Sequence, residues 1–537
     1  MLRIFKKLYI FIFFGFSSFC LPDIKQAISY DWGNQFGYVN ENGMIMWGKD
    51  WESNNLLFDG SWAIFPPMFG EEIEESFQNS LSNKISLDSL ETVSKINYQQ
   101  GDYGLDKFSI KINYAEKNRT IKLNGFKRSY FGNYNQYYAN NPQPQQQSYT
   151  AAIKSYEINQ NTGLSIGHFN TFSGLPDSTI NGLFDNRITS LNYFYRKIFD
   201  NISIKVSTDQ FLQRFKSNHN LSFYHKSRYL NRSVYEIEFS NLEGSIPISY
   251  GFKDNKRVTV LDSSISIDWV SLYLDFQFKS FTLFNKVIKY GNEIFYDYDL
   301  TLKKHIKSFN IFLSKETSHF LLHPFYLHNH DILNKNKFYR ISNNKGGIEW
   351  IGLSSVITFE VSNSRDQQQL GMESLAKKNR YSCVMLTLFK KLNSRMDASI
   401  SYNMTDTDNY YSGGIGDQIV LKIQSQFQLF SNFMKVELDT EFKQFFNRVN
   451  HSMINPIEMI PIIHAKNTYS NLKPVNLINA SLRAKVSTVS FEFQWINLSE
   501  IILSSLQSER DNLILIHPNM PYLSGQTNFS INWEFLN

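Results

Sequence analysis

Cysteine is nearly absent from this chain, since only Cys20 and Cys383 occur among its 537 residues. If Cys20 is removed with an N-terminal leader, the mature chain keeps a single cysteine and cannot form an internal disulfide bond. A large exported protein with this sequence must therefore be stable without disulfides.

Other features are absent as well. After the N-terminus, no segment is apolar over the ~20 residues that a membrane-spanning helix needs. The net charge is only +5 and the basic residues are scattered, which argues against nucleic acid as a partner. No GxSxG, HExxH or Walker-type motif occurs. We therefore predict no catalytic residues, no cofactor and no nucleic-acid partner.

The N-terminus has the pattern of a secretory signal peptide over residues 1–20. A basic region precedes an apolar run from Leu8 to Phe16, and small residues flank a cleavage site after Cys20. The residues concerned are Arg3, Lys6 and Lys7 in the basic region, and Ser18 and Cys20 at the site. Lipidation of Cys20 is the alternative, but bulky Phe19 disfavours it. The run is too short for a membrane anchor.

Aromatic residues are abundant, at 16% of the chain, and they occur in segments that alternate with period two. The clearest segment is 434–443. One of its faces holds Met434, Val436, Leu438, Thr440 and Phe442, and the other holds Lys435, Glu437, Asp439, Glu441 and Lys443. Such alternation predicts β-strands with one apolar and one polar face.

The strands and their connections together predict an outer-membrane barrel. Many alternating segments reach the ~9–11 residues that cross a bilayer at a tilt. Tight turns at 117–118, 200–201 and 431–432 contrast with long polar loops at 140–147, 174–186 and 363–380. We predict an all-β, antiparallel transmembrane β-barrel over residues 93–537, with about 22 strands (range 20–24) by this spacing. A soluble sheet is the alternative.

Residues 21–92 lack sustained alternation and are predicted to form a short periplasmic or lumen-inserted segment. A few irregular strands are the alternative there. Within the barrel, we predict two groups of residues by face. The lumen-lining group is Lys435, Glu437, Asp439, Glu441, Lys443, Arg483, Lys485, Glu492 and Glu534. The lipid-facing girdle is Tyr235, Trp269, Trp495, Trp533 and Phe535.

Two terminal stretches resemble a known barrel class. The segments 495–498 (WINL), 516–521 (IHPNMP) and 529–535 (FSINWEF) resemble the last hairpin of TonB-dependent receptors and of their plugless porin relatives. The segment 98–104 (YQQGDYG) resembles the opening strands of those barrels. The resemblance implies recognition by the barrel-insertion machinery. The chain departs from it in continuing after Phe535, in lacking an energy-coupling box, and in having too few N-terminal residues for a plug domain.

A porin-like channel or uptake barrel for small solutes is therefore our leading hypothesis, with outer-membrane lipid as a partner. A non-conducting structural, adhesion or envelope-assembly barrel is the second hypothesis, and a barrel enzyme is the third. A histidine-rich stretch is the best lead for a metal site. It contains His319, His323, His328, His330 and Asp331. Short His-rich tracts are compositional hints only, so we predict no metal.

Overall fold

The computed structural model describes a chain made almost entirely of strands. The described residues are 93–116, 118–129, 145–174, 182–219, 227–241, 248–260, 264–278, 280–321, 338–366, 379–405, 417–450, 452–454, 461–463, 470–506 and 525–536. The predicted signal peptide and the segment 21–92 lie outside them. Among the described residues, no helix has the length and apolar character needed to cross a membrane.

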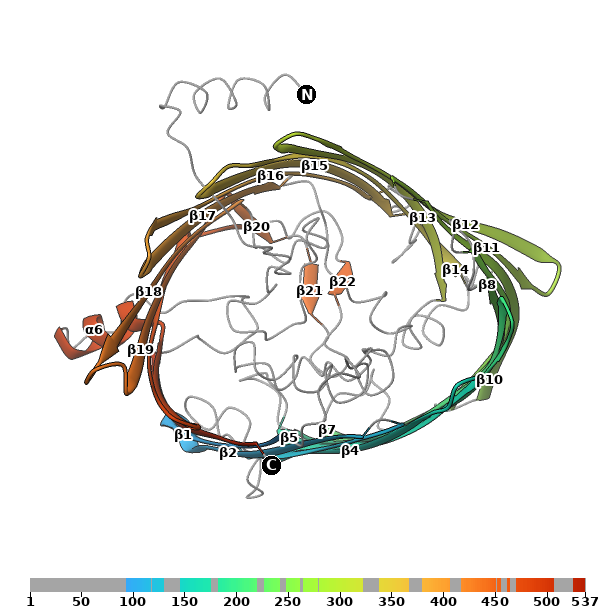
Figure 1. Cartoon of the computed structure of the whole chain (residues 1–537), viewed down its shortest axis with the longest axis horizontal. Helices are drawn as coiled ribbons and strands as arrows, with labels where there is room; N and C mark the ends of the chain where they lie inside the picture. Colours follow the sequence, from blue (N-terminus) through green and yellow to red (C-terminus); the bar gives the residue numbers. More distant parts are fainter. Residues whose placement is uncertain are drawn as a thin grey trace.

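Twenty-two antiparallel strands form one sheet, and the sheet closes because β1 pairs with β26 (Figure 1). The first half comprises β1 (Val93–Gly101), β2 (Leu105–Glu116), β3 (Arg119–Ser129), β4 (Gln145–Tyr156), β5 (Gln160–Gly174), β6 (Gly182–Phe199), β7 (Ile202–His219), β8 (Ser227–Asn241), β9 (Ile248–Val260), β10 (Ser264–Phe278), β11 (Phe281–Tyr290) and β12 (Glu293–Ile306). The second half comprises β13 (Phe309–Leu321), β14 (Phe338–Ile351), β15 (Ser355–Asp366), β16 (Asn379–Asn393), β17 (Met396–Thr405), β18 (Asp417–Leu429), β19 (Met434–Phe446), β24 (Val475–Val486), β25 (Val489–Ile496) and β26 (Gln526–Leu536). The predicted fold class and strand number are confirmed.

Smaller elements lie in the connections. A 3-10 turn, η2 (Asp102–Gly104), joins β1 to β2, and a helix, α6 (Leu498–Leu506), follows β25. Between β19 and β24, the chain forms two short hairpin pairs. These are β20 (Arg448–Asn450) with β23 (Ser470–Leu472), and β21 (Ser452–Ile454) with β22 (Pro461–Ile463). In Figure 1, β21 and β22 lie over the middle of the barrel opening.

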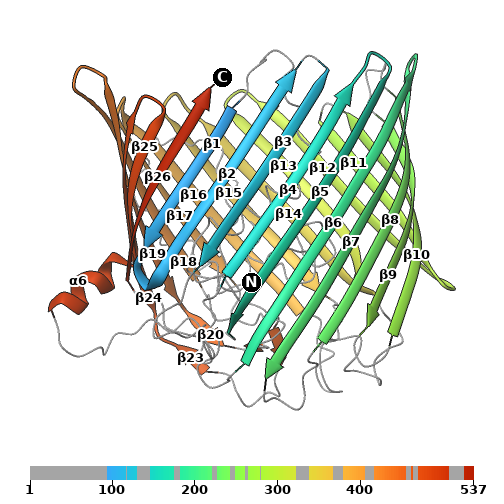
Figure 2. The same cartoon turned by 90° about the horizontal axis from the view of Figure 1, so that it is seen from below.

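The two ends of the barrel differ. The end that holds the paired residues Val93 and Leu536 also holds the tight turns 200–201, 307–308 and 487–488. The opposite end holds the longest connections, including 322–337, 447–474 and 497–525 (Figure 2). Short turns lie on the periplasmic side of such barrels and long loops on the outer side. The barrel end at which Leu321, Phe446 and Ile496 lie is therefore the extracellular one.

The strands are longer than predicted, so they continue into two of the predicted loops. β15 runs to Asp366 and β16 begins at Asn379, inside the expected loop 363–380. Likewise β6 begins at Gly182, within the expected loop 174–186, and it is 18 residues long. Such strands exceed the length that crosses the bilayer. Their additional residues extend the wall on the extracellular side.

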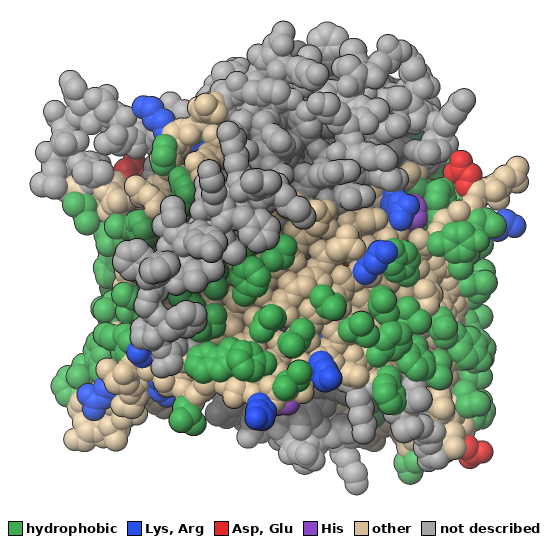
Figure 3. Space-filling model, turned by 90° about the horizontal axis from the view of Figure 1, so that it is seen from above, with side chains coloured by type: hydrophobic (Ala, Val, Ile, Leu, Met, Phe, Trp, Pro, Cys, Tyr) green, Lys and Arg blue, Asp and Glu red, His purple; other side chains and the backbone are tan. Residues whose placement is uncertain are grey.

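The outer face of the wall is apolar, as a lipid-facing surface requires. Hydrophobic side chains cover the wall in Figure 3, and large ones such as Leu272, Leu313 and Tyr296 are exposed. Because the sheet closes on itself, each strand pairs with a neighbour on both sides over most of its length, and these ladders satisfy its backbone hydrogen-bonding groups. A closed barrel with this outer surface is an outer-membrane barrel.

The wall has a seam between β12 and β13 at the extracellular end. The β12–β13 ladder stops at the pair Tyr298 and Thr317, although both strands continue beyond it. Phe338 of β14 contacts Trp269 of β10, with ring centroids 5.8 Å apart. Four strand spacings separate these strands along the sheet, about 19 Å. The end of the β13–β14 hairpin must therefore fold across the inner face of β10–β12, and Figure 1 shows β14 on that inner side.

Candidate functional site: the charged inner wall

An ionic cluster lies on the inner face of β18, β19, β24 and β25. At its centre, Arg483 contacts Glu492 at 3.2 Å and Glu437 at 3.3 Å. The pairing register places Arg483 opposite both carboxylates, on neighbouring strands. The side chain of Glu492 is almost completely buried, whereas Arg483 is partly exposed. The arginine therefore neutralises two acidic groups and still reaches the lumen.

The same cluster extends along β19. Lys443 and Lys422 bind the carboxylate of Glu441 at 2.7 Å and 2.9 Å, and Lys435 binds Glu437 at 2.7 Å. Lys435, Glu437, Glu441 and Lys443 share the face of β19 opposite to Leu438, which is exposed on the lipid side, and Lys422 is paired with Glu441 from β18. The alternation of the strand explains the separation of charges from lipid.

The remaining residues predicted to line the lumen lie on the same face. Asp439 is opposite Ser481, and Lys485 is opposite Lys435. Glu534 of β26 contacts Lys95 of β1 at 3.4 Å, directly across the closure of the barrel. All nine predicted residues therefore lie between β1, β19 and β24–β26, in one sector of the wall.

A second ionic cluster lies on the inner face of β6–β10, on the other side of the barrel in Figure 1. Glu238 contacts Lys205 at 3.2 Å and Arg196 at 3.5 Å, while Glu236 contacts Lys253 at 3.1 Å. The Tyr273 hydroxyl donates to Glu236 at 2.7 Å. Both clusters contain both signs of charge.

Tyr273 reaches Glu236 because Gly251 lies between them. Gly251 is paired with Tyr273, and a Cβ there would be 2.5 Å from the tyrosine hydroxyl oxygen. Only a residue without a side chain leaves this path open. In the sequence, Tyr235 and Ile237 alternate with the two glutamates, a pattern that predicts the facing of β8. The glutamates were nevertheless missed as site residues, because their cationic partners come from other strands.

Four of the five predicted girdle residues lie on the outer face. Tyr235 is 54% exposed and Trp533 47% exposed. Phe535 packs against Trp533, and Trp495 stacks on Phe493, which is itself exposed. Trp495 is near the extracellular end of β25, whereas Trp533 and Phe535 are near the periplasmic end of β26. They therefore lie toward opposite membrane interfaces.

Trp269 differs from the prediction. It shares a face of β10 with Tyr273, so it points inward, and it is only 9% exposed. It packs with Ile267, Ile288 and Phe338. The folded end of the β13–β14 hairpin covers this part of the inner wall with aromatic rings. Trp269 can face the inside of the barrel because Phe338 of the hairpin end packs on it there.

His319, the first residue of the histidine-rich stretch, lies beside the aromatic cluster around Trp269 and Phe338. The backbone N–H and ring Nδ1 of His319 lie 2.9 Å and 2.7 Å from Oδ1 of Asp297. Lys286 contacts the other carboxylate oxygen, Oδ2, at 3.3 Å. His319 packs on Phe295. Among described residues no group of three candidate metal ligands occurs. His323, His328, His330 and Asp331 lie outside the described residues, so the absence of a metal stays a prediction.

The charge balance of the first cluster gives a direct prediction. In the variant Arg483→Gln, Glu437 and Glu492 lose their shared cation, so the lumen should become more attractive to cations. Under a potassium chloride gradient, the reversal potential of the reconstituted barrel should shift toward the potassium equilibrium potential. The outward-facing lysine variant Lys289→Gln is the control and should leave it unchanged. An unchanged potential in Arg483→Gln would place the cluster outside the conducting path.

Comparisons with known proteins identify the fold. No protein-family model matches the sequence, and no curated protein sequence matches it. Similar solved structures include the FrpB iron transporter from Neisseria meningitidis (F5-1 variant), with a TM-score of 0.62 and 9% identity over 85% of this chain and 84% of that one.

Two further structures are similar over the same extent. They are the siderophore receptor PirA from Pseudomonas aeruginosa, with a TM-score of 0.60 and 8% identity over 84% of this chain and 82% of that one, and the copper transporter OprC, with a TM-score of 0.61 and 8% identity over 84% and 82%. At these identities the likeness shows the fold alone. The fold is that of TonB-dependent receptor barrels, the barrel class that the terminal segments were predicted to resemble.

Proposed function

We propose that this barrel is an uptake channel through which small water-soluble solutes cross the outer membrane by diffusion. The observation that carries the proposal is the inner wall. Charged residues of both signs line two sectors of a 22-stranded closed barrel, and charges on that face are favourable only where water reaches them. A barrel of this strand number has a lumen that wall side chains alone do not fill.

The pairing of the charges bears on the class of solute. Each glutamate of the two clusters has at least one cation within 3.5 Å. Because acidic and basic groups alternate along the same path, no strong preference for anions or cations follows. Neutral polar or zwitterionic solutes suit such a wall best. The inward-folded β13–β14 end and the β21–β22 pair narrow the extracellular opening and would set an upper limit on solute size.

The test is the planar-bilayer conductance of the refolded mature protein, measured with and without residues 21–92. Stable open steps from the full mature chain would support passive passage, and their size would bound the pore. Large steps that occur only after removal of residues 21–92 would instead indicate a lumen plug and partner-driven uptake. Absence of steps from both proteins would overturn the channel proposal and favour the structural or adhesion barrel.

A further inference from the structure

Three basic residues lie on the outer face of β6 and β7, near the extracellular ends of these strands (Figure 2). Arg214 and Lys216 share the face of β7 that exposes Val206, and Arg187 of β6 is paired with Arg214. All three side chains are exposed. We call Arg187, Arg214 and Lys216 the basic patch. Because the patch faces outward, it is separate from the charged inner wall.

The basic patch lies at the depth of lipid headgroups. Arg214 is the thirteenth residue of β7 from its periplasmic end, and Arg187 is the thirteenth residue of β6 from its own periplasmic end. A strand tilted by about 40° rises roughly 2.5 Å per residue along the membrane normal, so both arginines lie about 30 Å from the periplasmic end. The apolar band of an outer-membrane barrel is only about 25 Å tall. The arginines therefore lie just beyond its extracellular edge.

The outer wall changes from apolar to polar at this level. On the periplasmic side of the patch, Leu191 and Leu212 are exposed on the same face. On the extracellular side, Asn218 and Ser227 are exposed. Tyr229 is paired with Arg214 and is 44% exposed, and tyrosine is typical of the membrane interface. A lipid lying along this wall would contact apolar side chains with its acyl chains and cations with its headgroup.

The patch carries more positive than negative charge. Asp185 binds Arg187 through both carboxylate oxygens, with N–O distances of 2.9 and 3.0 Å. Three cations and one carboxylate leave two positive charges. Arg214 lies directly opposite Arg187, and like charges in that arrangement repel each other. An anion between them would remove the repulsion, and guanidinium groups bind phosphate oxygens through paired hydrogen bonds.

We propose that the basic patch binds the phosphate of an outer-leaflet lipid. The phosphate lies between the guanidinium groups of Arg187 and Arg214, with the ammonium of Lys216 on its extracellular side. One acyl chain runs along Leu212 toward the bilayer middle. The proposal concerns the outer surface alone, so it is independent of the solute that passes through the lumen.

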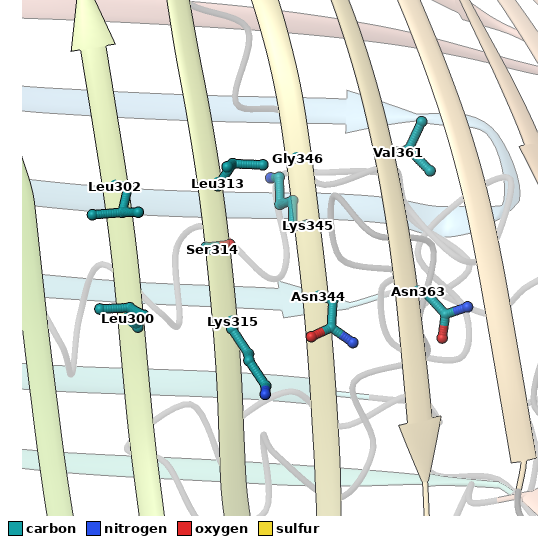
Figure 4. A pocket seen from close by; sticks show the side chains of 10 residues that line it. All are labelled: Leu300, Leu302, Leu313, Ser314, Lys315, Asn344, Lys345, Gly346, Val361 and Asn363. Atoms are coloured by element: carbon teal, nitrogen blue, oxygen red, sulfur yellow. The ribbon is translucent and has the colours of Figure 1, made fainter.

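Another outward lysine lies at a different depth and provides a comparison. Lys315 of β13 lines a groove of about 390 Å³, together with Leu313 and Val361 (Figure 4). It is the seventh residue of β13 from the periplasmic end, roughly 15 Å along the membrane normal, so it lies inside the apolar band. Its ammonium lies 5.7 Å from the centre of the Tyr298 ring. Lipid phosphates do not reach this depth, so Lys315 is a matched control.

The test uses the full mature chain, purified in a mild detergent and freed of lipid, with bisphosphorylated lipid A as the added probe. Native mass spectrometry should detect one tightly retained lipid on the wild-type protein. The double variant Arg214→Gln, Lys216→Gln should weaken retention at least about tenfold, because charge-assisted contacts are lost. Arg187 is left unchanged, because its loss would leave Asp185 without this partner. Both replaced side chains are exposed, so the barrel should still fold.

Three controls separate the proposed site from general lipid binding. Lys315→Gln should retain the lipid like the wild type. Lipid A without its phosphates should bind the wild type and the double variant equally. An excess of inorganic phosphate should leave the lipid bound, because the acyl chains also contribute. Wild-type retention in the double variant would overturn the proposal, as would an equal loss in Lys315→Gln. Displacement of the lipid by inorganic phosphate would also overturn it, because free phosphate would then be the ligand.

Discussion

Replacing Leu438 with arginine is expected to destabilise the inserted barrel by about 2–4 kcal/mol, whereas Glu437→Gln on the neighbouring position should be tolerated. Leu438 is 39% exposed on the outer face of β19. It is the fifth residue of that strand from the periplasmic end, roughly 10 Å along the membrane normal and so near the bilayer middle. An arginine there loses hydration that no neighbouring group replaces.

The measurement is reversible urea unfolding of the protein in lipid vesicles. The fraction folded is read from SDS gels of unboiled samples, in which the folded barrel migrates differently from the unfolded chain. Val436 shares the outer face but is 6% exposed, so the neighbours that cover it would complicate the result. Glu437→Gln controls for a change at the same depth on the inner face. If both variants unfolded like the wild type, the assignment of the two faces of β19 would be wrong.

Truncating Phe338 to alanine should release the end of the β13–β14 hairpin from the inner wall. The Phe338 ring packs on Trp269, Tyr290 and Phe295, with centroids 5.1 to 5.8 Å apart. Loss of a buried phenylalanine typically costs about 3–5 kcal/mol, and the contacts of His319 with Asp297 and Phe295 would then have to hold this hairpin end without the Phe338 ring. The unit conductance should rise, and the amides of residues 318–321 should exchange hydrogen faster.

A matched control is available on the same wall. Tyr296 lies next to Phe295 on β12 but points outward and is 63% exposed. Tyr296→Ala removes an aromatic ring of similar size without touching the cluster, so conductance and hydrogen exchange should stay at wild-type values. Equal conductance in Phe338→Ala and wild type would mean that the hairpin end does not restrict the pore.

Much of the barrel could be predicted from local alternation, and the reason is physical. In a strand that separates lipid from water, the polarity of each side chain indicates which of the two it faces. The faces of the residues from Lys435 to Lys443 could therefore be predicted from the sequence alone. Strand number followed from the spacing of turns. The signal peptide and the segment 21–92 stay predictions, because they lie outside the described residues.

The inward fold of β13–β14 could not be predicted, because it depends on contacts between strands that are distant along the sheet. Trp269 shows how this misled the facing assignment. Its apolar neighbours on β10, Ile265 and Ile267, occupy odd positions, whereas Leu272 and Leu274 occupy even ones. The apolar side thus changes within one unbroken strand. This change was the available signal that one half of β10 packs against something inside the barrel.

The seam between β12 and β13 also affects how the protein fits between the two leaflets. Where the hairpin end lies inside the wall, the perimeter facing lipid is shorter by about two strand spacings, roughly 10 Å. At this level the wall is two layers thick, with β10–β12 facing the lipid and the end of the β13–β14 hairpin behind them.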